Sequence, residues 1–303
     1  MDVFEGSEKK CEVIMDGTQI NLRQFSKDFW HQMVDRCEAT VLSEIHNESC
    51  DAYLLSESSL FVWEDHFLLI TCGQTKLIQS LLFFVEHVDI SCIQQILFQR
   101  KNEYYSEMQH SDFTQDVEQL NRLVQGKSLS FGTPDKHYTD LFHLEENYEP
   151  AVDDRTYELL MYGIAQDSTH FFMTPNLTVQ AIRSYLRVSD FLAGWQLDDF
   201  AFEPCGYSLN AIHGDRYLTI HVTPQQEYSY VSLESNVDLQ EMIAVPLQIL
   251  RPNSFDLVMY QPSDVVAILE QCQQYKVVQQ EEKNIDCGYQ VIFMQLELQQ
   301  ALN

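Results

Sequence analysis

Short runs in which apolar and polar residues alternate dominate the chain, and this pattern predicts β-strands. In the first half the runs cover residues 11–15, 40–45, 60–63, 67–72, 93–98, 129–131 and 138–144. In the second half they cover residues 156–164, 198–202, 217–222, 228–233, 255–260, 277–280 and 289–296. Short connections between the runs favour antiparallel pairing over parallel strands joined by crossover helices.

Apolar residues recur at helical spacing in five segments, which are 25–37, 76–88, 113–124, 177–186 and 265–269. Because these helices are widely separated by strands, we expect an α+β protein with large antiparallel sheets and helices on the outside. No linker rich in proline or serine and no low-complexity tract interrupts the pattern. The sequence therefore predicts one domain over residues 1–303.

Composition narrows the classes of function. A hydrophobic content of 45% suffices for a packed core, and no apolar run is long enough to span a bilayer or to act as a leader. We therefore expect a cytoplasmic protein without a membrane segment. A formal net charge of -28 argues against a nucleic-acid partner, because phosphate binding needs clustered lysine and arginine. The charge favours a cationic small molecule, although an acidic surface that only aids solubility explains it as well.

The eight cysteines are scattered without any Cys-x-x-Cys pair. This distribution indicates neither a disulfide framework nor a zinc site, so we expect reduced thiols and no metal.

Three short segments carry candidate chemistry. The first, 56–59, is a polar Ser-Glu-Ser-Ser island between two strand-like apolar runs and predicts a turn. The second places Cys72 at the end of a hydrophobic strand, where a buried structural cysteine is commoner than a reactive one. In the third, Ser208 and His221 lie on two strand candidates joined by a Gly-Asp turn, so they are expected to face each other across a hairpin.

Taken together and in this order, the segments Leu-Ser-Glu-Ser-Ser at 55–59, Thr-Cys-Gly at 71–73 and Cys-Gly-Tyr-Ser-Leu-Asn at 205–210 resemble one family. It is the eukaryotic-type, pyruvoyl-dependent S-adenosylmethionine decarboxylases, which are made as self-processing proenzymes. The resemblance begins at residues 4–9 and keeps its spacing through 228–232. It implies a four-layer α/β/β/α sandwich of two large antiparallel sheets with outer helices, built from two similar halves.

The resemblance implies that Ser58 attacks the carbonyl of Glu57 and that the chain breaks there. The small β chain, 1–57, would stay bound to the large α chain, 58–303, and Ser58 would become a pyruvoyl group. Through a Schiff base, this cofactor would decarboxylate S-adenosyl-L-methionine to S-adenosylmethioninamine, the aminopropyl donor for spermidine and spermine biosynthesis.

Further catalytic roles follow from the resemblance. Ser208 would donate a hydrogen bond to the oxyanion during processing, and His221 would remove the Cα proton. Cys72 would return a proton to the substrate's α-carbon, a task that suits a thiol near its free pKa. Glu5 and Glu8 would complete the catalytic set.

Substrate binding is implied for five residues. Phe4 and Phe202 would sandwich the adenine, and Leu55 and Glu57 would add contacts. Gln225 stands where the family has a ribose-binding glutamate. An amide is a weaker acceptor than a carboxylate, so this departure puts substrate affinity in question.

An activating diamine, putrescine, would bind an acidic group made of Glu12, Asp154, Glu158 and Glu234. Ile70 stands where diamine-responsive members often carry a lysine, two residues before the catalytic cysteine. That departure either alters activation or leaves more negative charge for an external cation.

Two alternatives stay open: a catalytically dead partner that activates an active decarboxylase, and a pyruvoyl decarboxylase of another amino acid. The family includes dimers and monomers, so a homodimer also stays open.

Overall fold

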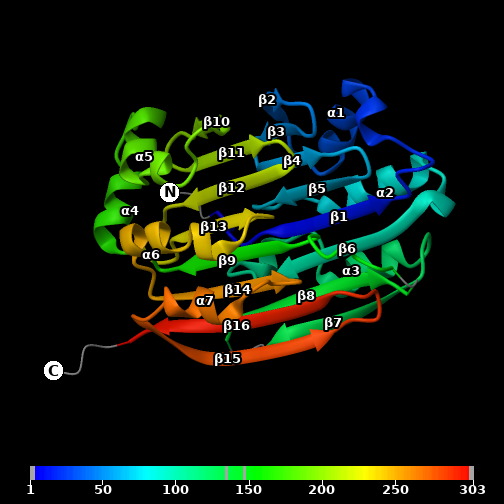
Figure 1. The fold of residues 1–303 in the computed structure, drawn as a ribbon. Coiled ribbons are helices and arrows are strands. Elements are labelled where there is room, and N and C mark those ends of the chain that lie inside the picture. Colours follow the sequence, from blue (N-terminus) through cyan, green and yellow to red (C-terminus); the bar gives the residue numbers. More distant parts are fainter. Residues whose placement is uncertain (1–3, 134–135, 146–147, 300–303) are drawn as a thin grey trace. The chain divides into compact units, whose positions relative to one another are not determined.

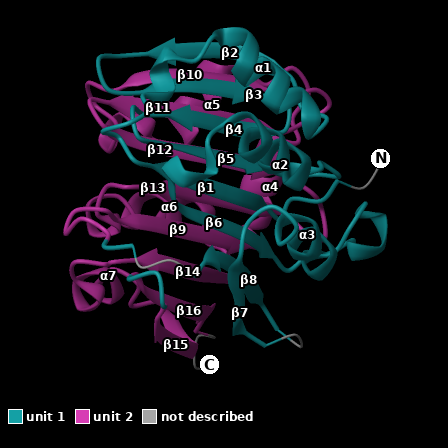
Figure 2. Cartoon of the chain, turned by 90° about the vertical axis from the view of Figure 1, so that its right-hand side faces the viewer, with its two compact units in different colours: residues 1–149, 286–288 teal, residues 150–285, 289–303 magenta. Residues whose placement is uncertain are grey.

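The computed structural model describes residues 4–133, 136–145 and 148–299. The chain divides into two compact units, one of residues 1–149 with 286–288 and one of residues 150–285 with 289–303 (Figure 2). Within the described residues, each unit contains an eight-stranded antiparallel sheet together with helices (Figure 1). The predicted α+β class is therefore confirmed.

The first unit has the sheet order β2-β3-β4-β5-β1-β6-β8-β7. Its strands are β1 (Lys9–Met15), β2 (Val41–His46), β3 (Asp51–Leu55), β4 (Ser58–Val62), β5 (His66–Thr71), β6 (Ile93–Lys101), β7 (Gly126–Gly132) and β8 (Tyr138–Leu144). Its α-helices are α1 (Lys27–Arg36), α2 (Leu77–His87) and α3 (Phe113–Leu120), and its short 3-10 helices are η1 (Leu22–Gln24), η2 (Ile90–Cys92) and η3 (Ser106–Met108).

The second unit has the order β10-β11-β12-β13-β9-β14-β16-β15, which is the order of the first sheet moved on by eight strands. The predicted pair of similar halves is thus confirmed. The strands are β9 (Thr156–Tyr162), β10 (Gln196–Ala201), β11 (Tyr207–His213), β12 (Arg216–Thr223), β13 (Tyr230–Ser235), β14 (Ser254–Tyr260), β15 (Tyr275–Asn284) and β16 (Gln290–Leu298). The helices are α4 (Gln166–Phe172), α5 (Val179–Tyr185), α6 (Ala244–Leu250), α7 (Val265–Glu270), η4 (Val188–Asp190) and η5 (Leu239–Glu241).

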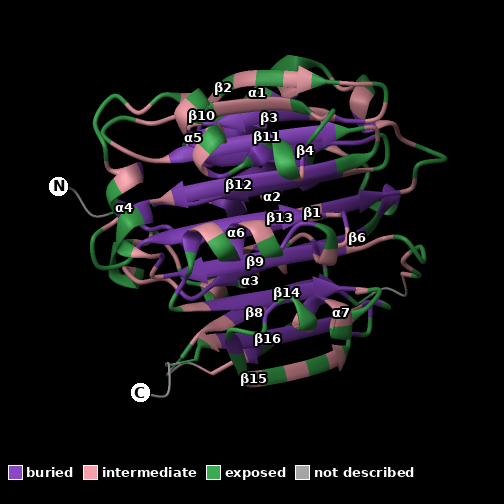
Figure 3. Ribbon diagram, turned by 60° about the vertical axis from the view of Figure 1, so that its left-hand side comes forward, coloured by how far each residue is buried: buried purple, intermediate pink, exposed green. Residues whose placement is uncertain are grey.

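Alternate residues of each strand pack against the helices of the same unit. In the first unit, Cys11 and Val13 of β1 share a core with Trp30 of α1 and Phe84 of α2, whose rings stack at a centroid distance of 6.3 Å. In the second unit, the odd-numbered residues of β9, such as Leu159, likewise belong to the helix-covered core. Because strand side chains alternate between faces, the even-numbered residues of β1 and β9 lie on the sheet face away from the helices. Most strand residues are buried on both faces (Figure 3).

Three expectations from the sequence need correction. The 56–59 island is not a turn throughout, because Ser58 and Ser59 pair with both β3 and β5 and so begin β4. Helix α3 ends at Leu120, and the next residues form turns although their apolar spacing continues. Helices α4 and α6 were missed, since α4 is largely polar and α6 carries Pro246 in its first turn, where proline is tolerated.

Within the described ranges, no helix has the length and apolar character that crossing a membrane requires.

Candidate functional site

The hairpin between β3 and β4 places Ser58 in a strained backbone conformation. Leu55 pairs with Ser58, so the turn contains only Ser56 and Glu57. Ser58 has a φ of 131° and is 1% exposed. Non-glycine residues avoid this region of backbone space, at a cost of about 1–3 kcal/mol when they are held in it. The strained residue directly follows the peptide bond that the family resemblance implies will break.

The carbonyl of Glu57 receives two hydrogen bonds from Cys72. The Cys72 backbone N–H donates to this oxygen at 3.0 Å, and its Sγ donates at 3.5 Å. Such donors polarise a carbonyl and stabilise negative charge that develops on its oxygen during nucleophilic attack. The structure therefore brings together Ser58 and Cys72, which belong to separate motifs in the sequence.

Burial changes the acidity of Cys72. Desolvation raises the pKa of its thiol well above the ordinary value, and the carboxylates of Glu57 and Glu8 raise it further, while Lys9 opposes them. The expectation of a thiol near its free pKa was wrong, because a thiolate is disfavoured where water is excluded and carboxylates are close. At neutral pH the thiol keeps its proton.

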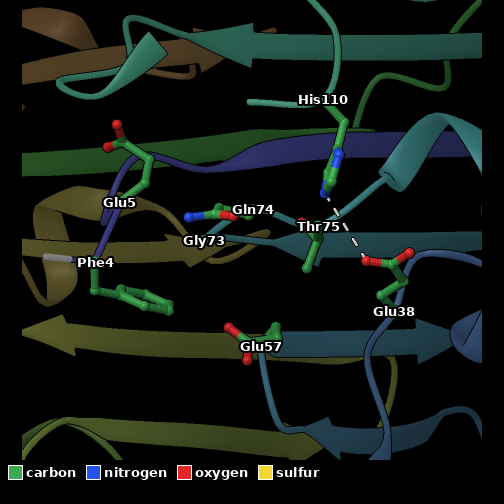
Figure 4. Close-up of a pocket in the computed structure, with 8 residues that line it drawn as sticks. All are labelled: Phe4, Glu5, Glu38, Glu57, Gly73, Gln74, Thr75 and His110. Carbon is green, nitrogen blue, oxygen red and sulfur yellow. Dashed lines mark ion pairs between the residues drawn. The ribbon is translucent and has the colours of Figure 1, made fainter. Parts of the chain in front are cut away.

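A cavity of about 260 Å³ in the first unit lies beside this turn. Its lining residues are Phe4, Glu5, Glu38, Glu57, Gly73, Gln74, Thr75 and His110 (Figure 4). Gly73 has a φ of +66°, and a Cβ there would lie 3.0 Å from the Phe4 ring and 3.1 Å from Oε2 of Glu57. Glycine thus lets an aromatic ring and a carboxylate meet over the turn. Phe4 is 38% exposed, and its ring lines the cavity (Figure 4).

Several carboxylates lie in or near this cavity, and each has different partners. Glu5 accepts hydrogen bonds from the backbone N–H groups of Ser7 at 2.9 Å and Tyr105 at 2.8 Å. Glu8 lies deeper and pairs with Lys101 at 3.3 Å. Burial raises the pKa of Glu57 to about 7, although the charge of Lys9 acts in the opposite direction. A cavity walled by carboxylates and a ring suits a cationic ligand.

In the second unit, Ser208 and His221 occupy directly opposed positions on β11 and β12, as the hairpin predicted. Ser208 Oγ lies 2.9 Å from Nδ1 of His221, and Thr219 Oγ1 lies 2.7 Å from Nε2. Thr219 Oγ1 also donates to Oδ1 of Asn210 at 3.3 Å. The imidazole is thus held between two hydroxyl groups, and either ring nitrogen takes the donor or acceptor role according to the tautomer.

The other residues predicted to bind substrate differ in how far they are buried. Phe202 is half-buried, and its ring contacts Phe200 at a centroid distance of 4.9 Å. Gln225 is half-buried just beyond β12. Leu55 is fully buried in the core of the first unit, so any contact of this residue with a ligand would come from its backbone.

Acidic side chains lie on the helix-free face of the second sheet. Glu158 on β9 and Glu234 on β13 are directly opposed, and their exposed fractions are 0% and 2%. Tyr217 donates to Glu234 at 2.8 Å, and Tyr289 donates to Asp154 at 2.6 Å.

Asp256 of β14 is also buried, and sequence analysis missed it because a single acidic residue in an apolar strand gives no motif. Glu12 belongs to the first unit and is half-buried on β1. Among the described residues, no group of three or more potential ligands has the arrangement of a metal site.

Comparison with known proteins agrees with the motifs. The family model described as adenosylmethionine decarboxylase matches residues 1–297. The chain is 30% identical to an S-adenosylmethionine decarboxylase proenzyme of Dictyostelium discoideum, over 86% of this chain and 75% of the relative. It is 32% identical to the proenzyme of Trypanosoma brucei brucei, over 85% and 75%, and 33% identical to that of Caenorhabditis elegans, over 85% and 76%.

A solved structure shows the same fold. The Trypanosoma brucei AdoMetDC-delta26 monomer is similar with a TM-score of 0.62 and 22% sequence identity, over 80% of this chain and 99% of that one. This likeness confirms the fold class predicted from the sequence.

The strain at Ser58 predicts that glycine is more stabilising than alanine at this position, the reverse of the order expected in an ordinary strand. Ser58→Gly should be more stable than Ser58→Ala by about 1 kcal/mol, because glycine adopts a positive φ without steric cost. Urea denaturation of the two single-chain variants measures the difference. Ser59 is the matched control, since its φ is not positive. There Ser59→Gly should be the less stable variant, and the same order at both positions would contradict a strained Ser58.

The raised pKa of Glu57 predicts a pH dependence. The folded chain binds this proton more tightly than the unfolded chain, whose carboxyl has an ordinary pKa of 4.5, against about 7 when folded. The stabilisation is complete below pH 4.5 and is lost as the pH rises to about 7.

In an uncleaved Ser58→Ala background, Glu57→Gln should therefore reduce the fall in unfolding free energy between about pH 5 and about pH 7.5. Glu118→Gln, an exposed glutamate of α3, serves as the control. Equal pH dependence with and without Glu57→Gln would rule out the raised pKa.

Proposed function

Since the chain belongs to the adenosylmethionine decarboxylase family, a family of carboxy-lyases, we propose that it decarboxylates S-adenosyl-L-methionine through a pyruvoyl group made from its own Ser58. The product would be S-adenosylmethioninamine, the aminopropyl donor for spermidine and spermine. The observation that carries this proposal is the strained Ser58 beside a Glu57 carbonyl with two donors from Cys72.

The proposal begins with self-processing. The hydroxyl of Ser58 attacks the carbonyl carbon of Glu57, and the peptide becomes an ester. A base then removes the Cα proton of residue 58, the Glu57 carboxylate leaves, and dehydroalanine remains at the new N-terminus. Water converts it to the pyruvoyl group and releases ammonia.

The hydrogen bonds support the roles of this chain's residues in processing. The Cys72 N–H stabilises the oxygen of Glu57 as it gains charge. Nδ1 of His221 lies 2.9 Å from the Ser208 hydroxyl, and Nε2 lies 2.7 Å from the Thr219 hydroxyl, so the ring is fixed in orientation. We assign His221 to removal of the Cα proton and Ser208 to hydrogen bonding of the oxyanion.

In the decarboxylation step, the pyruvoyl group would supply a carbonyl that forms a Schiff base with the substrate's amine and draws electrons from the departing carboxylate. Cys72, which holds its proton at neutral pH, would then protonate the α-carbon.

Binding would rest on charge and ring faces. Phe4 and the carboxylates of Glu5 and Glu57 suit the sulfonium group of the substrate. Phe202 would stack on the adenine. Gln225 would hydrogen-bond the ribose with an amide in place of the family's carboxylate.

The purified protein should separate on a denaturing gel into fragments 1–57 and 58–303, the larger with a blocked, carbonyl-reactive N-terminus. Ser58→Ala should remain one chain and release no carbon dioxide from S-adenosylmethionine. Ser59→Ala, a change at the next residue of the same strand, should still be cleaved. A wild-type chain that stays intact would favour the inactive-partner alternative. Cleavage followed by decarboxylation of a free amino acid alone would favour the second alternative, a pyruvoyl decarboxylase of another amino acid.

We also propose that the acidic group Glu12, Asp154, Glu158 and Glu234 binds a diamine such as putrescine. Two like charges opposed across paired strands and hidden from water destabilise a sheet unless protons or cations neutralise them, and Glu158 and Glu234 have this arrangement.

Putrescine should therefore raise the melting temperature of the wild type by a few degrees, about 2–4 °C if it adds roughly 1 kcal/mol. Glu158→Gln should abolish the shift, whereas Glu241→Gln, an exposed glutamate in the same unit, should keep it. A shift of equal size in Glu158→Gln would place the diamine elsewhere.

A further inference from the structure

Lys9 is a buried lysine whose ammonium has a single hydrogen-bond acceptor among the described residues. It lies at the start of β1 and is 3% exposed. Its Nζ donates to the backbone carbonyl of Gly73 at 3.0 Å and lies 4.0 Å from Oε1 of Glu103. Burial lowers the pKa of this ammonium, and Glu103 opposes the shift. Burying a charged side chain costs free energy, and a buried lysine does not improve solubility, so its presence here points to another role.

The carbonyl that Lys9 contacts belongs to the residue after Cys72. Nε2 of Gln109 donates to the same Gly73 oxygen at 3.2 Å. The N–H of Gly73 donates to the backbone oxygen of Glu5 at 2.9 Å, and Thr75 Oγ1 donates to the carbonyl of Cys72 at 2.9 Å. The carbonyl of Cys72 and both backbone groups of Gly73 are thus fixed by hydrogen bonds to side chains and to the backbone of Glu5.

Lys9 lies at one end of a network of ion pairs, which it joins through Glu103. Glu103 accepts from Arg100 at 2.5 Å, and Arg100 also pairs with Asp116 at 2.7 Å. Ser111 donates to Asp116 at 2.5 Å. The buried charges therefore alternate in sign from Lys9 to Asp116, which keeps each of them paired.

We propose that Lys9 is a positioning residue for the proton transfer assigned to Cys72. It acts through the Gly73 carbonyl, which fixes the turn that carries the thiol, and Gln109 supplies the second donor to that carbonyl. This inference rests on the proposed function, because only a proton-donating Cys72 needs its thiol held in one direction.

Thiol direction matters because the proton has two possible destinations once carbon dioxide has left. Protonation of the substrate carbon gives the product amine and restores the pyruvoyl group. Protonation of the carbon that came from the pyruvoyl carbonyl leaves the nitrogen on the chain as an N-terminal alanine and releases the substrate skeleton as an aldehyde. No other reactant is needed, since the water lost on condensation returns on hydrolysis. A thiol held in one direction reduces the second outcome.

The test uses Lys9→Met, which keeps the length of the side chain and removes its donor and charge. In the cleaved enzyme we expect kcat to fall about ten-fold with KM changed less than about two-fold, and alanine-terminated large chain to form about ten times more often per turnover. Peptide mass spectrometry of the large chain counts the alanine. Lys9→Arg, which keeps the donor and the charge, should restore most of both values.

A second readout needs no activity. In the uncleaved Ser58→Ala protein, Lys9→Met should speed hydrogen exchange at the amides of Cys72 and Gly73 by about ten-fold, and Gln109→Leu should do so more weakly. Lys127→Met, at a lysine 48% exposed, is the control.

The outcomes separate the inference from the proposed function. A wild type that is neither cleaved nor active overturns the proposed function, while the exchange experiment still tests the contact with Gly73. An active wild type whose Lys9→Met variant keeps its kcat, its alanine frequency and its exchange rates overturns the role of Lys9. Faster exchange spread evenly over the first unit also overturns it, because it would show a general loss of stability.

Discussion

The hydrogen bond from the Cys72 N–H to the Glu57 carbonyl is the interaction on which the chemistry of the first unit depends. It continues the β4–β5 ladder one step beyond the strands, which end at Ser58 and Thr71 in this direction. The ladder fixes both sides of the turn, so the turn cannot relax without breaking sheet hydrogen bonds. The positive φ of Ser58 persists for that reason.

Buried charge is the second constraint, and it is unusual in a chain with a net charge of -28. Lys9 starts β1, and Arg100 and Lys101 are the last two residues of β6; all three are almost fully buried. Each has a carboxylate partner, among them Glu8 and Glu103. The desolvation of such groups offsets much of their attraction, so the network contributes little to stability. Its effect is to hold the backbone around Cys72 in one arrangement.

The sequence predicted most of the strands, because short runs rich in β-branched and aromatic residues, bounded by turn residues, are typical of strands. It also predicted that Ser208 and His221 oppose each other, since a short Gly-Asp turn sets hairpin register. Strain at Ser58 follows from the family resemblance alone, because self-cleavage requires the turn to hold this residue in an unusual geometry. The raised pKa of Cys72 could not be predicted, since it depends on contacts between residues far apart in the chain. Lys9 lies before the predicted strand 11–15 and gave no signal beyond its place in the 4–9 segment of the resemblance.

A buried thiol of high pKa fits proton donation better than a thiol near its free pKa would. Under the proposed function, the carbon left after loss of carbon dioxide is a strong base, so a weak acid suffices as its donor. The thiolate that results is disfavoured by burial and by the nearby carboxylates of Glu57 and Glu8, and it therefore regains a proton readily. Glu57, with a pKa of about 7, is a neighbouring carboxyl that exchanges protons at neutral pH. The same burial that makes Cys72 a poor nucleophile thus makes it a donor that is restored in every turnover.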